Sequence, residues 1–282
     1  GSKSGIDLPE DVKGRVAGRI FKQEFWDKNH KIWCQRAESG YPEVAEKDPE
    51  RARLLQKFAI ENCSEGMKFR AGDAVNNSIG QGDTVVTPLQ MAIAYAAIAN
   101  GGTVYEPRVV KAIMNPDGSL VERIKPVVKS TIPVSPENLK YIQKSLESTT
   151  INGTGASPFY GFPLSKIPVA TKTGTGEVLG KQSTSWFASY APANNPKYVI
   201  VMMVAQGGTG SGTSGPSVRR IYEEIFGIRG GVIDPATSIL KGGSPVNSLP
   251  GIRKDGLPNY PEVDDLLTQT ASPSPSPTEG NS

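Results

Sequence analysis

The sequence predicts a mixed α/β sandwich in which helices flank an antiparallel sheet. Three segments, 169–175, 184–190 and 198–205, are apolar and rich in β-branched or aromatic residues, as strands are. A helix with one apolar face follows them at 215–226, and an almost wholly apolar helix precedes them at 89–99. Antiparallel strands that are followed by a helix form one half of such a sandwich.

The composition is that of a globular protein and excludes several other classes. Of the 282 residues, 37% are hydrophobic, which is enough for the core of one or two domains. The 31 basic and 28 acidic residues leave a net charge of +3, whereas a nucleic-acid-binding protein would carry a concentrated basic surface, so we expect no nucleic acid partner. No apolar run approaches the roughly 18 residues of a membrane-spanning helix, and the first residues lack the pattern of a signal peptide.

The region 16–70 is rich in charged residues and is predicted to be partly helical. Asp48 and Pro49 are typical of the first positions of a helix. Leu54, Leu55 and Phe58 follow at the spacing of one helix face, which predicts that this face is the packed one. A solvated lid and a partner surface are both open as roles for the region.

The middle of the chain carries local signals for two helices and a hairpin. Thr87 and Gln90 form a capping box ahead of the apolar helix 89–99, which is expected to be buried. The segment 108–124 predicts a β-hairpin because turn-forming residues stand at its centre. A second helix is predicted to begin after Ser135, and its inner face would consist of Leu139, Ile142 and Leu146.

The strand-like segment 167–177, IPVATKTGTGE, carries the strongest chemical pattern. Lys172 places a cation on the strand, and Gly174 lacks a side chain, which allows another backbone to approach closely. A peptide laid along this strand would pair with it main chain to main chain. The hydroxyls of Thr173 and Thr175 would then face a terminal carboxylate, which the charge of Lys172 attracts.

A Lys-Thr-Gly alone is a weak pattern, and its neighbours make it specific. The segments SIGQGDTVVTPLQMA at 78–92, NGTGA at 152–156 and SWFASYAP at 185–192 accompany it in a fixed order. This set resembles the transpeptidase domain of class B penicillin-binding proteins, most closely the elongation-type members, whose superfamily has Lys-Thr-Gly as its third signature. We interpret 78–82 as a packed loop and not as a catalytic segment, and Trp186 and Phe187 as core.

The resemblance implies a penicillin-binding/serine β-lactamase-like fold and a serine D,D-transpeptidase activity. Such an enzyme cross-links peptidoglycan stem peptides that end in D-Ala-D-Ala through an acyl-enzyme, and β-lactams inhibit it covalently. In similar enzymes the Thr175 N–H forms half of the oxyanion hole, and Lys172 assists proton transfer. Lys172 and Thr175 are therefore the catalytic candidates, and neither a metal nor another cofactor is expected. The substrate-binding candidates are Lys172, Thr173, Gly174, Thr175 and Gly176.

Two motifs of this family are missing from the sequence. The one Ser-x-x-Lys match, Ser238 to Lys241, follows the Lys-Thr-Gly strand instead of preceding it, and no Ser-x-Asn occurs. We therefore expect residues 1–233 to be the C-terminal part of a transpeptidase domain whose nucleophile lies in a missing N-terminal part. The alternatives are a catalytically inert interaction module of this family, and a serine β-lactamase or D,D-carboxypeptidase.

The resemblance also assigns a location and a domain organisation. It places the chain at the extracytoplasmic face of the bacterial cell membrane, with its anchor outside this sequence and a membrane glycosyltransferase as a partner. The charged region 16–70 is an insertion relative to the usual family core. The segment 234–282 is rich in Pro, Ser and Gly and is expected to be a largely disordered tail.

Cys34 and Cys63 are the two cysteines of the chain. The implied location permits oxidation, and a bridge that closes a loop of about 30 residues would add roughly 3 kcal/mol of stability in the chain-entropy model. A zinc site with Asp27 and His30 is a further possibility, since these residues precede Cys34 at helical spacing. The disulfide is favoured over two free thiols, and zinc is favoured least.

Overall fold

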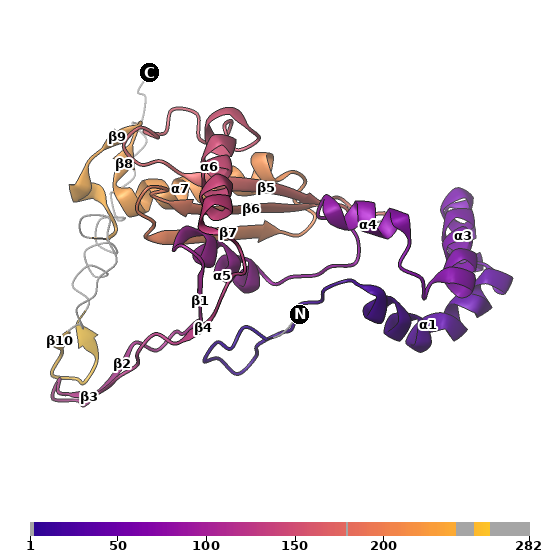
Figure 1. Ribbon diagram of the computed structural model, residues 1–282, viewed down its shortest axis with the longest axis horizontal. Helices are drawn as coiled ribbons and strands as arrows, with labels where there is room; N and C mark the ends of the chain where they lie inside the picture. The colour runs from indigo at the N-terminus through magenta and orange to yellow at the C-terminus, as the bar shows by residue number, and fades with distance from the viewer. Residues whose placement is uncertain (1–2, 179, 241–250, 260–282) are drawn as a thin grey trace, which may run out of the picture.

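The centre of the fold is a three-stranded antiparallel sheet (Figure 1), seen in a computed structural model that describes residues 3–178, 180–240 and 251–259. Its strands are β5 (Ala170–Gly176), β6 (Thr184–Ala191) and β7 (Tyr198–Val204), in the order β5-β6-β7. These are the three strands that the sequence predicts. The predicted mixed fold, with helices on an antiparallel sheet, is confirmed.

The register of the strands determines which side chains share a face of the sheet. Lys172 lies opposite Ala188, which lies opposite Val201. Residues directly opposite each other in antiparallel strands point to the same side, and neighbours along a strand point to opposite sides. Lys172 therefore shares a face with Ala188 and Val201, and Thr171 and Thr173 lie on the other face.

One face of the sheet is covered by α7 (Gly215–Phe226), which follows β7 as predicted. Phe187, Val218 and Tyr222 are completely buried between the helix and the sheet. Each such side chain contributes roughly 1.5–3 kcal/mol by its removal from water. The helix ends at Gly227, whose φ of 64° lies in the left-handed region that suits a glycine C-cap.

The opposite face is partly covered by α5 (Pro88–Ala99), and α6 (Pro136–Asn152) packs against β5 (Figure 1). The predicted capping box of α5 is confirmed, because the Gln90 N–H donates to Thr87 Oγ1 (3.1 Å) and the Thr87 N–H donates to Gln90 Oε1 (3.0 Å). Tyr95, Ala97 and Ala99 are buried, and of the residues of α5 only Pro88 and Ala94 are exposed, so the helix is largely buried, as expected, but not completely.

Short paired strands complete the sheet-forming part of the chain. The predicted hairpin is confirmed as β2 (Ala112–Met114) and β3 (Leu120–Arg123), whose turn includes Gly118 at a φ of 87°. β1 (Thr103–Tyr105) pairs with β4 (Val128–Thr131). The remaining short elements are β8 (Ile228–Arg229) with β9 (Val232–Ile233), η2 (Pro235–Thr237), and β10 (Gly251–Ile252) with β11 (Pro258–Asn259).

The structured part of the chain extends beyond residue 233, into the segment that was expected to be a disordered tail. The Ile239 N–H donates to the Glu224 carbonyl (3.0 Å), and Leu240 packs against the core beneath α7. These contacts satisfy backbone groups and bury apolar surface, which the composition of the segment does not reveal. The rest of the expected tail, 241–250 and 260–282, lies outside the described residues.

The charged region folds as a helical hairpin, Arg19–Glu65, which projects from one end of the sheet (Figure 1). It consists of α1 (Arg19–Ser39), α2 (Pro42–Ala45) and α3 (Pro49–Glu65), and α4 (Ala71–Ser78) follows it. Asp48 caps α3 as predicted, because its carboxylate accepts a hydrogen bond from the Arg51 N–H (2.9 Å).

The packed face of α3 differs from the predicted one. Leu54 and Phe58 are 43% and 37% exposed and Leu55 is half-buried, whereas Ala52 and Ala59 are buried. Small side chains allow two helices to approach closely, and the Cα atoms of Cys34 and Cys63 are only 4.8 Å apart. The face of α3 that packs against α1 is thus the one with small residues, which allows the close approach, and not the one with the larger side chains of Leu54 and Phe58.

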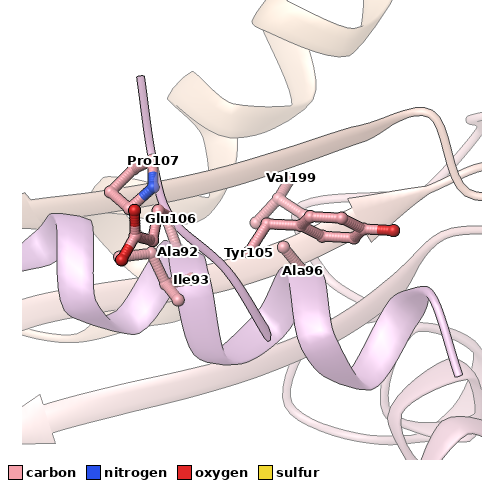
Figure 2. Close-up of a pocket in the computed structure, with 7 residues that line it drawn as sticks. All are labelled: Ala92, Ile93, Ala96, Tyr105, Glu106, Pro107 and Val199. Carbon is pink, nitrogen blue, oxygen red and sulfur yellow. The ribbon is translucent and has the colours of Figure 1, made fainter. Parts of the chain in front are cut away.

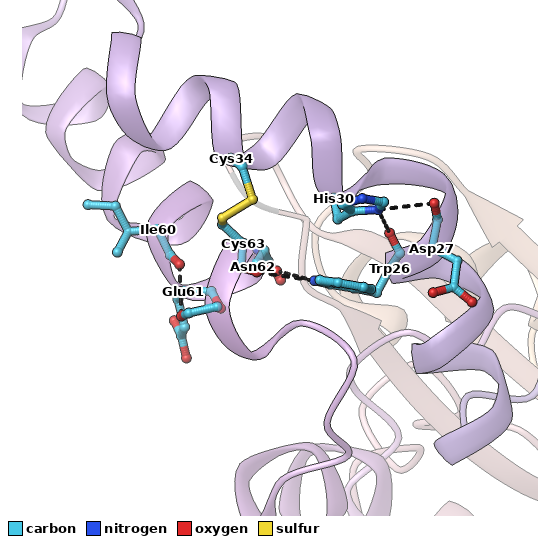
Figure 3. Close-up of a disulfide and its surroundings, with 9 residues drawn as sticks. Trp26, Asp27, His30, Cys34, Ile60, Glu61, Asn62 and Cys63 are labelled. Atoms are coloured by element: carbon cyan, nitrogen blue, oxygen red, sulfur yellow. Dashed lines mark hydrogen bonds between the residues drawn. A yellow bond between two sulfur atoms is a disulfide. The ribbon is translucent and has the colours of Figure 1, made fainter.

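Cys34 and Cys63 form a disulfide between α1 and α3 (Figure 3). The Trp26 indole N–H supports the same contact by donating to the Asn62 carbonyl (3.0 Å). His30 Nδ1 lies near the main-chain oxygens of its own helix, 3.2 Å from that of Trp26. The alternatives of a zinc site and of two free thiols are therefore wrong, because both sulfurs are bonded to each other.

Within the described ranges, no helix combines the length and the apolar character that crossing a membrane requires.

The disulfide predicts a redox-dependent mass and stability. The purified oxidised protein should weigh two protons less than the reduced protein, and Cys34→Ser with Cys63→Ser should lower the free energy of unfolding by about 2–4 kcal/mol. Intact mass spectrometry and denaturant titration measure these quantities. Two thiols that react with iodoacetamide in the native, oxidised sample would contradict the pairing.

Candidate active site

The Lys-Thr-Gly strand, β5, lies at an edge of the described sheet, with β6 on one side. Lys172 is exposed, and its Nζ donates to the Thr173 carbonyl (2.8 Å). The buried half of the strand begins two residues earlier, at Ala170, where Tyr95 of α5 covers the sheet. The face that carries Lys172 is thus closed at one end by α5 and open at the other.

Trp186 and Met203 continue this open face beside Lys172. Gly174 lies opposite Trp186, and Trp186 lies opposite Met203. Trp186 is half-buried and Met203 is 39% exposed, whereas the neighbouring Phe187 is completely buried on the other face. The interpretation of Phe187 as core is confirmed, but Trp186 faces the candidate site.

The opposite face of β5 rests on the segment that follows α6. Thr173 Oγ1 is hydrogen-bonded to Thr154 Oγ1 (2.6 Å), and Thr171 Oγ1 to Thr150 Oγ1 (2.9 Å). A Cβ atom on Gly155 would lie 2.3 Å from Thr171 Oγ1, so this position has no room for a side chain. The NGTG pattern therefore supports the Lys-Thr-Gly strand from behind.

A second close backbone approach occurs at Gly174. The short π-helix η1 (Gly210–Ser214) packs so tightly here that a Cβ atom on Gly210 would lie 2.1 Å from the Trp186 carbonyl oxygen and 2.8 Å from that of Gly174. Ser214 and Ser185 reinforce the contact with a hydrogen bond between their hydroxyls (2.7 Å). Gly210 is a supporting residue that the sequence analysis missed, although it stands in the glycine-rich run 207–212.

The open edge of β5 is held by one side-chain amide. Gln81 Nε2 donates to the Thr175 carbonyl (2.9 Å), and Gln81 Oε1 accepts from the Glu177 N–H (3.1 Å). In an antiparallel strand the N–H and C=O of one residue point to the same edge. The Thr175 N–H, the expected oxyanion donor, therefore lies on this open edge as well.

The interpretation of residues 78–82 as a packed loop is wrong, because all of them except the half-buried Gln81 are exposed. Ile79 is 69% exposed, so this loop contributes little to the core. Its polar residue instead contacts the strand on which the candidate site is built. The sequence shows the segment but gives no indication of the residue that it contacts.

Two other places are unsuited to catalysis. Ser238, which begins the Ser-x-x-Lys match, donates its hydroxyl to the Ile225 carbonyl (2.5 Å) and accepts from the Leu240 N–H (3.0 Å), and Lys241 lies outside the described residues. A shallow hollow lies between α5 and β7 (Figure 2). Its lining is mostly apolar and includes no β5 residue: Ala92, Ile93, Ala96, Tyr105, Glu106, Pro107 and Val199.

Solved structures share the fold of this chain. Penicillin-binding protein PBP2 from Helicobacter pylori matches with a TM-score of 0.51 and 23% identity, over 77% of this chain and 31% of that protein. Penicillin-binding protein 2B from Streptococcus pneumoniae matches with a TM-score of 0.51 and 20% identity, over 77% of this chain and 29% of that protein. At these identities the matches show the fold alone.

Sequence comparison assigns the family. The peptidoglycan D,D-transpeptidase FtsI homolog of Mesostigma viride is 28% identical over 70% of this chain and 35% of its own length. The peptidoglycan D,D-transpeptidase MrdA of Haemophilus influenzae is 30% identical over 54% of this chain, and the chain spans only 25% of that relative. Residues 50–226 match the family profile of the penicillin binding protein transpeptidase domain, and the chain therefore belongs to this family.

Proposed function

We propose that this chain provides the substrate-binding strand of a serine-type peptidoglycan D,D-transpeptidase. The observation that carries the proposal is an exposed lysine, Lys172, next to an open strand edge that presents the Thr175 N–H. The family membership and the names of the relatives support the same reaction class. The nucleophile would come from residues outside this sequence, because no Ser-x-x-Lys precedes Lys172.

The site suits a peptide that ends in a carboxylate. An extended stem peptide would pair by strand addition with the part of the β5 edge that Gln81 leaves free, which includes the Thr175 N–H. The Lys172 ammonium would attract the terminal carboxylate from one face of β5. The hydroxyls of Thr173 and Thr175 lie on the other face of the strand and would donate to the carboxylate around the open edge, with Thr173 also accepting from Thr154. Gly174 avoids crowding on the face that it shares with Trp186, because a Cβ atom there would lie only 3.0 Å from the Trp186 Cβ atom.

The reaction would proceed through an acyl-enzyme. A serine oxygen would attack the carbonyl carbon of the penultimate D-Ala, and the developing oxyanion would accept a hydrogen bond from the Thr175 N–H. Collapse of this intermediate would break the peptide bond and release the terminal D-Ala with a proton. The amine of a second stem peptide would then attack the ester, form the cross-link and return the serine. A β-lactam would acylate the same serine.

The proposed setting is the extracytoplasmic face of a bacterial membrane. The disulfide between Cys34 and Cys63 supports this placement, because such bonds persist in oxidising compartments. The proposed partners are the remaining part of the transpeptidase domain, the stem peptides, β-lactams and a membrane glycosyltransferase. Lys172 and Thr175 have the catalytic roles, and Thr173, Gly174 and Gly176 contribute to substrate binding.

The proposed function predicts how this chain behaves by itself. Without a Ser-x-x-Lys motif ahead of β5, the 282 residues should form no stable adduct with penicillin. Intact mass spectrometry after incubation with a fluorescent penicillin measures the adduct. A covalent adduct on any serine of the chain, Ser238 included, would contradict the prediction. A longer form that contains Ser-x-x-Lys should become labelled, and its failure to do so would favour the inert module.

The second prediction concerns Lys172 and Thr175 in a form of the protein that acylates. Lys172→Ala should slow acylation by about 100-fold, because loss of one stabilising group in such a site costs about 3 kcal/mol. Thr175→Val keeps the backbone N–H and removes the hydroxyl, so its loss should be smaller, about tenfold. Stopped-flow acylation by a carboxylate-bearing β-lactam measures both rates.

The control for these variants is Lys166→Ala, an exposed lysine just ahead of β5. All three variants should keep the free energy of unfolding within about 0.5 kcal/mol of the unsubstituted protein, since they change exposed side chains. Acylation at the unsubstituted rate in Lys172→Ala, with an unchanged melting temperature, would mean that β5 is scaffold and not site.

A further inference from the structure

Lys22, in the first turns of α1, connects the helical hairpin to two other elements. Its Nζ lies 3.0 Å from Asp73 Oδ1, on α4, and 2.8 Å from Asp83 Oδ2, on the loop that follows α4. The Lys22 side chain is only 14% exposed and that of Asp73 only 20%. The Asp83 side chain is more exposed, at 44%. Two carboxylates from separate elements therefore share one largely buried ammonium, with Asp83 on the solvent side.

The Asp83 end of this cluster leads directly to the candidate active site. Asp83 stands two residues after Gln81, whose amide holds the Thr175 carbonyl and the Glu177 N–H. The Asp83 carbonyl also accepts from Arg15 Nε (2.8 Å). Gln81 is held on its N-terminal side by its own N–H, which donates to the Asn76 carbonyl (2.9 Å), and on its C-terminal side by the contacts of Asp83.

The helical hairpin is a stiff support for Lys22. Its two long helices are joined by the Cys34–Cys63 disulfide. The hairpin also reaches the site region through α3. A Cβ atom on Gly180, in the loop after β5, would lie 2.7 Å from the Arg51 guanidinium. The hairpin therefore adjoins β5 both through the Gln81 loop and through the loop between β5 and β6.

The charges of the cluster show why the Lys22 ammonium is needed to keep Asp73 and Asp83 close together. Burial disfavours the charged form of Lys22, but hydrogen bonds with Asp83 and Asp73 outweigh it, so the pKa of Lys22 is raised. Burial also opposes the charge of Asp73, yet the Arg70 N–H and Lys22 lower the pKa of Asp73. Removal of the ammonium would leave the carboxylates of Asp73 and Asp83 close together without a counter-charge, and they would repel each other, with water screening the more exposed Asp83 in part.

We propose that Lys22 is a positioning residue for the Lys-Thr-Gly strand: by holding Asp83 against α4, it keeps Gln81 on the open edge of β5 and the Thr175 N–H in place. The expected effect of Lys22 on the reaction rests on the proposed function, whereas its expected effect on the strand rests on the structure alone. The region 16–70 then acts as a support for the active site. Preorganised donors are effective because they need no rearrangement during the reaction.

The experiment compares four forms of the acylating protein: unsubstituted, Lys22→Met, Lys22→Arg and Lys28→Met. Methionine keeps most of the length of lysine and removes its charge, and arginine restores the charge. Lys28 is exposed on the same helix, so Lys28→Met is the matched control. Hydrogen–deuterium exchange of peptides that cover 172–178 reports on the strand, and β-lactam acylation reports on the reaction.

In Lys22→Met we expect exchange at 172–178 to be about tenfold faster, because the edge frays once Gln81 leaves it. We expect acylation to be about tenfold slower. Lys22→Arg should restore both values toward those of the unsubstituted protein, and Lys28→Met should change neither. Gln81→Leu should reproduce the exchange change with the Lys22 cluster intact.

Unchanged exchange at 172–178 in Lys22→Met would overturn the inference, and so would faster exchange with acylation at the unsubstituted rate. If Lys22→Met fails to fold, Asp83→Asn replaces it, since this variant keeps the Lys22–Asp73 pair and weakens only the link to the loop. If the unsubstituted protein does not acylate, the proposed function fails, while the exchange comparison still tests the effect of Lys22 on the strand.

Discussion

The contact between Gly210 and Gly174 is the constraint on which the candidate site depends. A strand that binds a peptide at its edge cannot be covered there by another strand, and an unpaired edge is prone to fray. In this chain β5 is held from the other directions instead. Gly210 brings η1 against the backbone of Gly174 and Trp186 so closely that no side chain would fit between them. The other edge of β5 is paired with β6 along its whole length, and together these contacts hold the strand while one edge stays free of a further strand.

The same constraint explains why several short motifs occur together. Gly155 approaches Thr171, and Thr154 is hydrogen-bonded to Thr173, so the NGTG segment and the Lys-Thr-Gly strand form one packed unit. Gln81 completes this unit at the edge by pairing with Thr175 and Glu177 as a short piece of strand would. Motifs that are far apart in the sequence are thus contacts of a single strand, on which Lys172 and Thr175 remain exposed.

Local signals in the sequence predicted most of the elements, and long-range contacts account for the errors. Strand composition identified β5, β6 and β7, and side-chain caps located Asp48 and Thr87, since both depend on residues only a few positions apart. The face of α3 was assigned wrongly because a preference for large apolar residues cannot foresee the close helix contact at Ala52 and Ala59. Gly210 was missed because its role depends on a backbone that is distant in the sequence.

The helical hairpin is held together by one kind of contact and attached to the rest of the chain by another. Within the hairpin, a disulfide and the buried Ala52 and Ala59 hold α1 to α3, and neither depends on the sheet. Toward the rest of the chain, charge supplies the attachment, through Lys22 and its two aspartates. Partly buried ion pairs are directional and are less screened by salt than exposed pairs. They orient a rigid body strongly while adding little net stability, because desolvation offsets much of their attraction. Through Asp83, such an attachment fixes the loop that carries Gln81 relative to the hairpin. It does so without adding apolar side chains near the open face of β5.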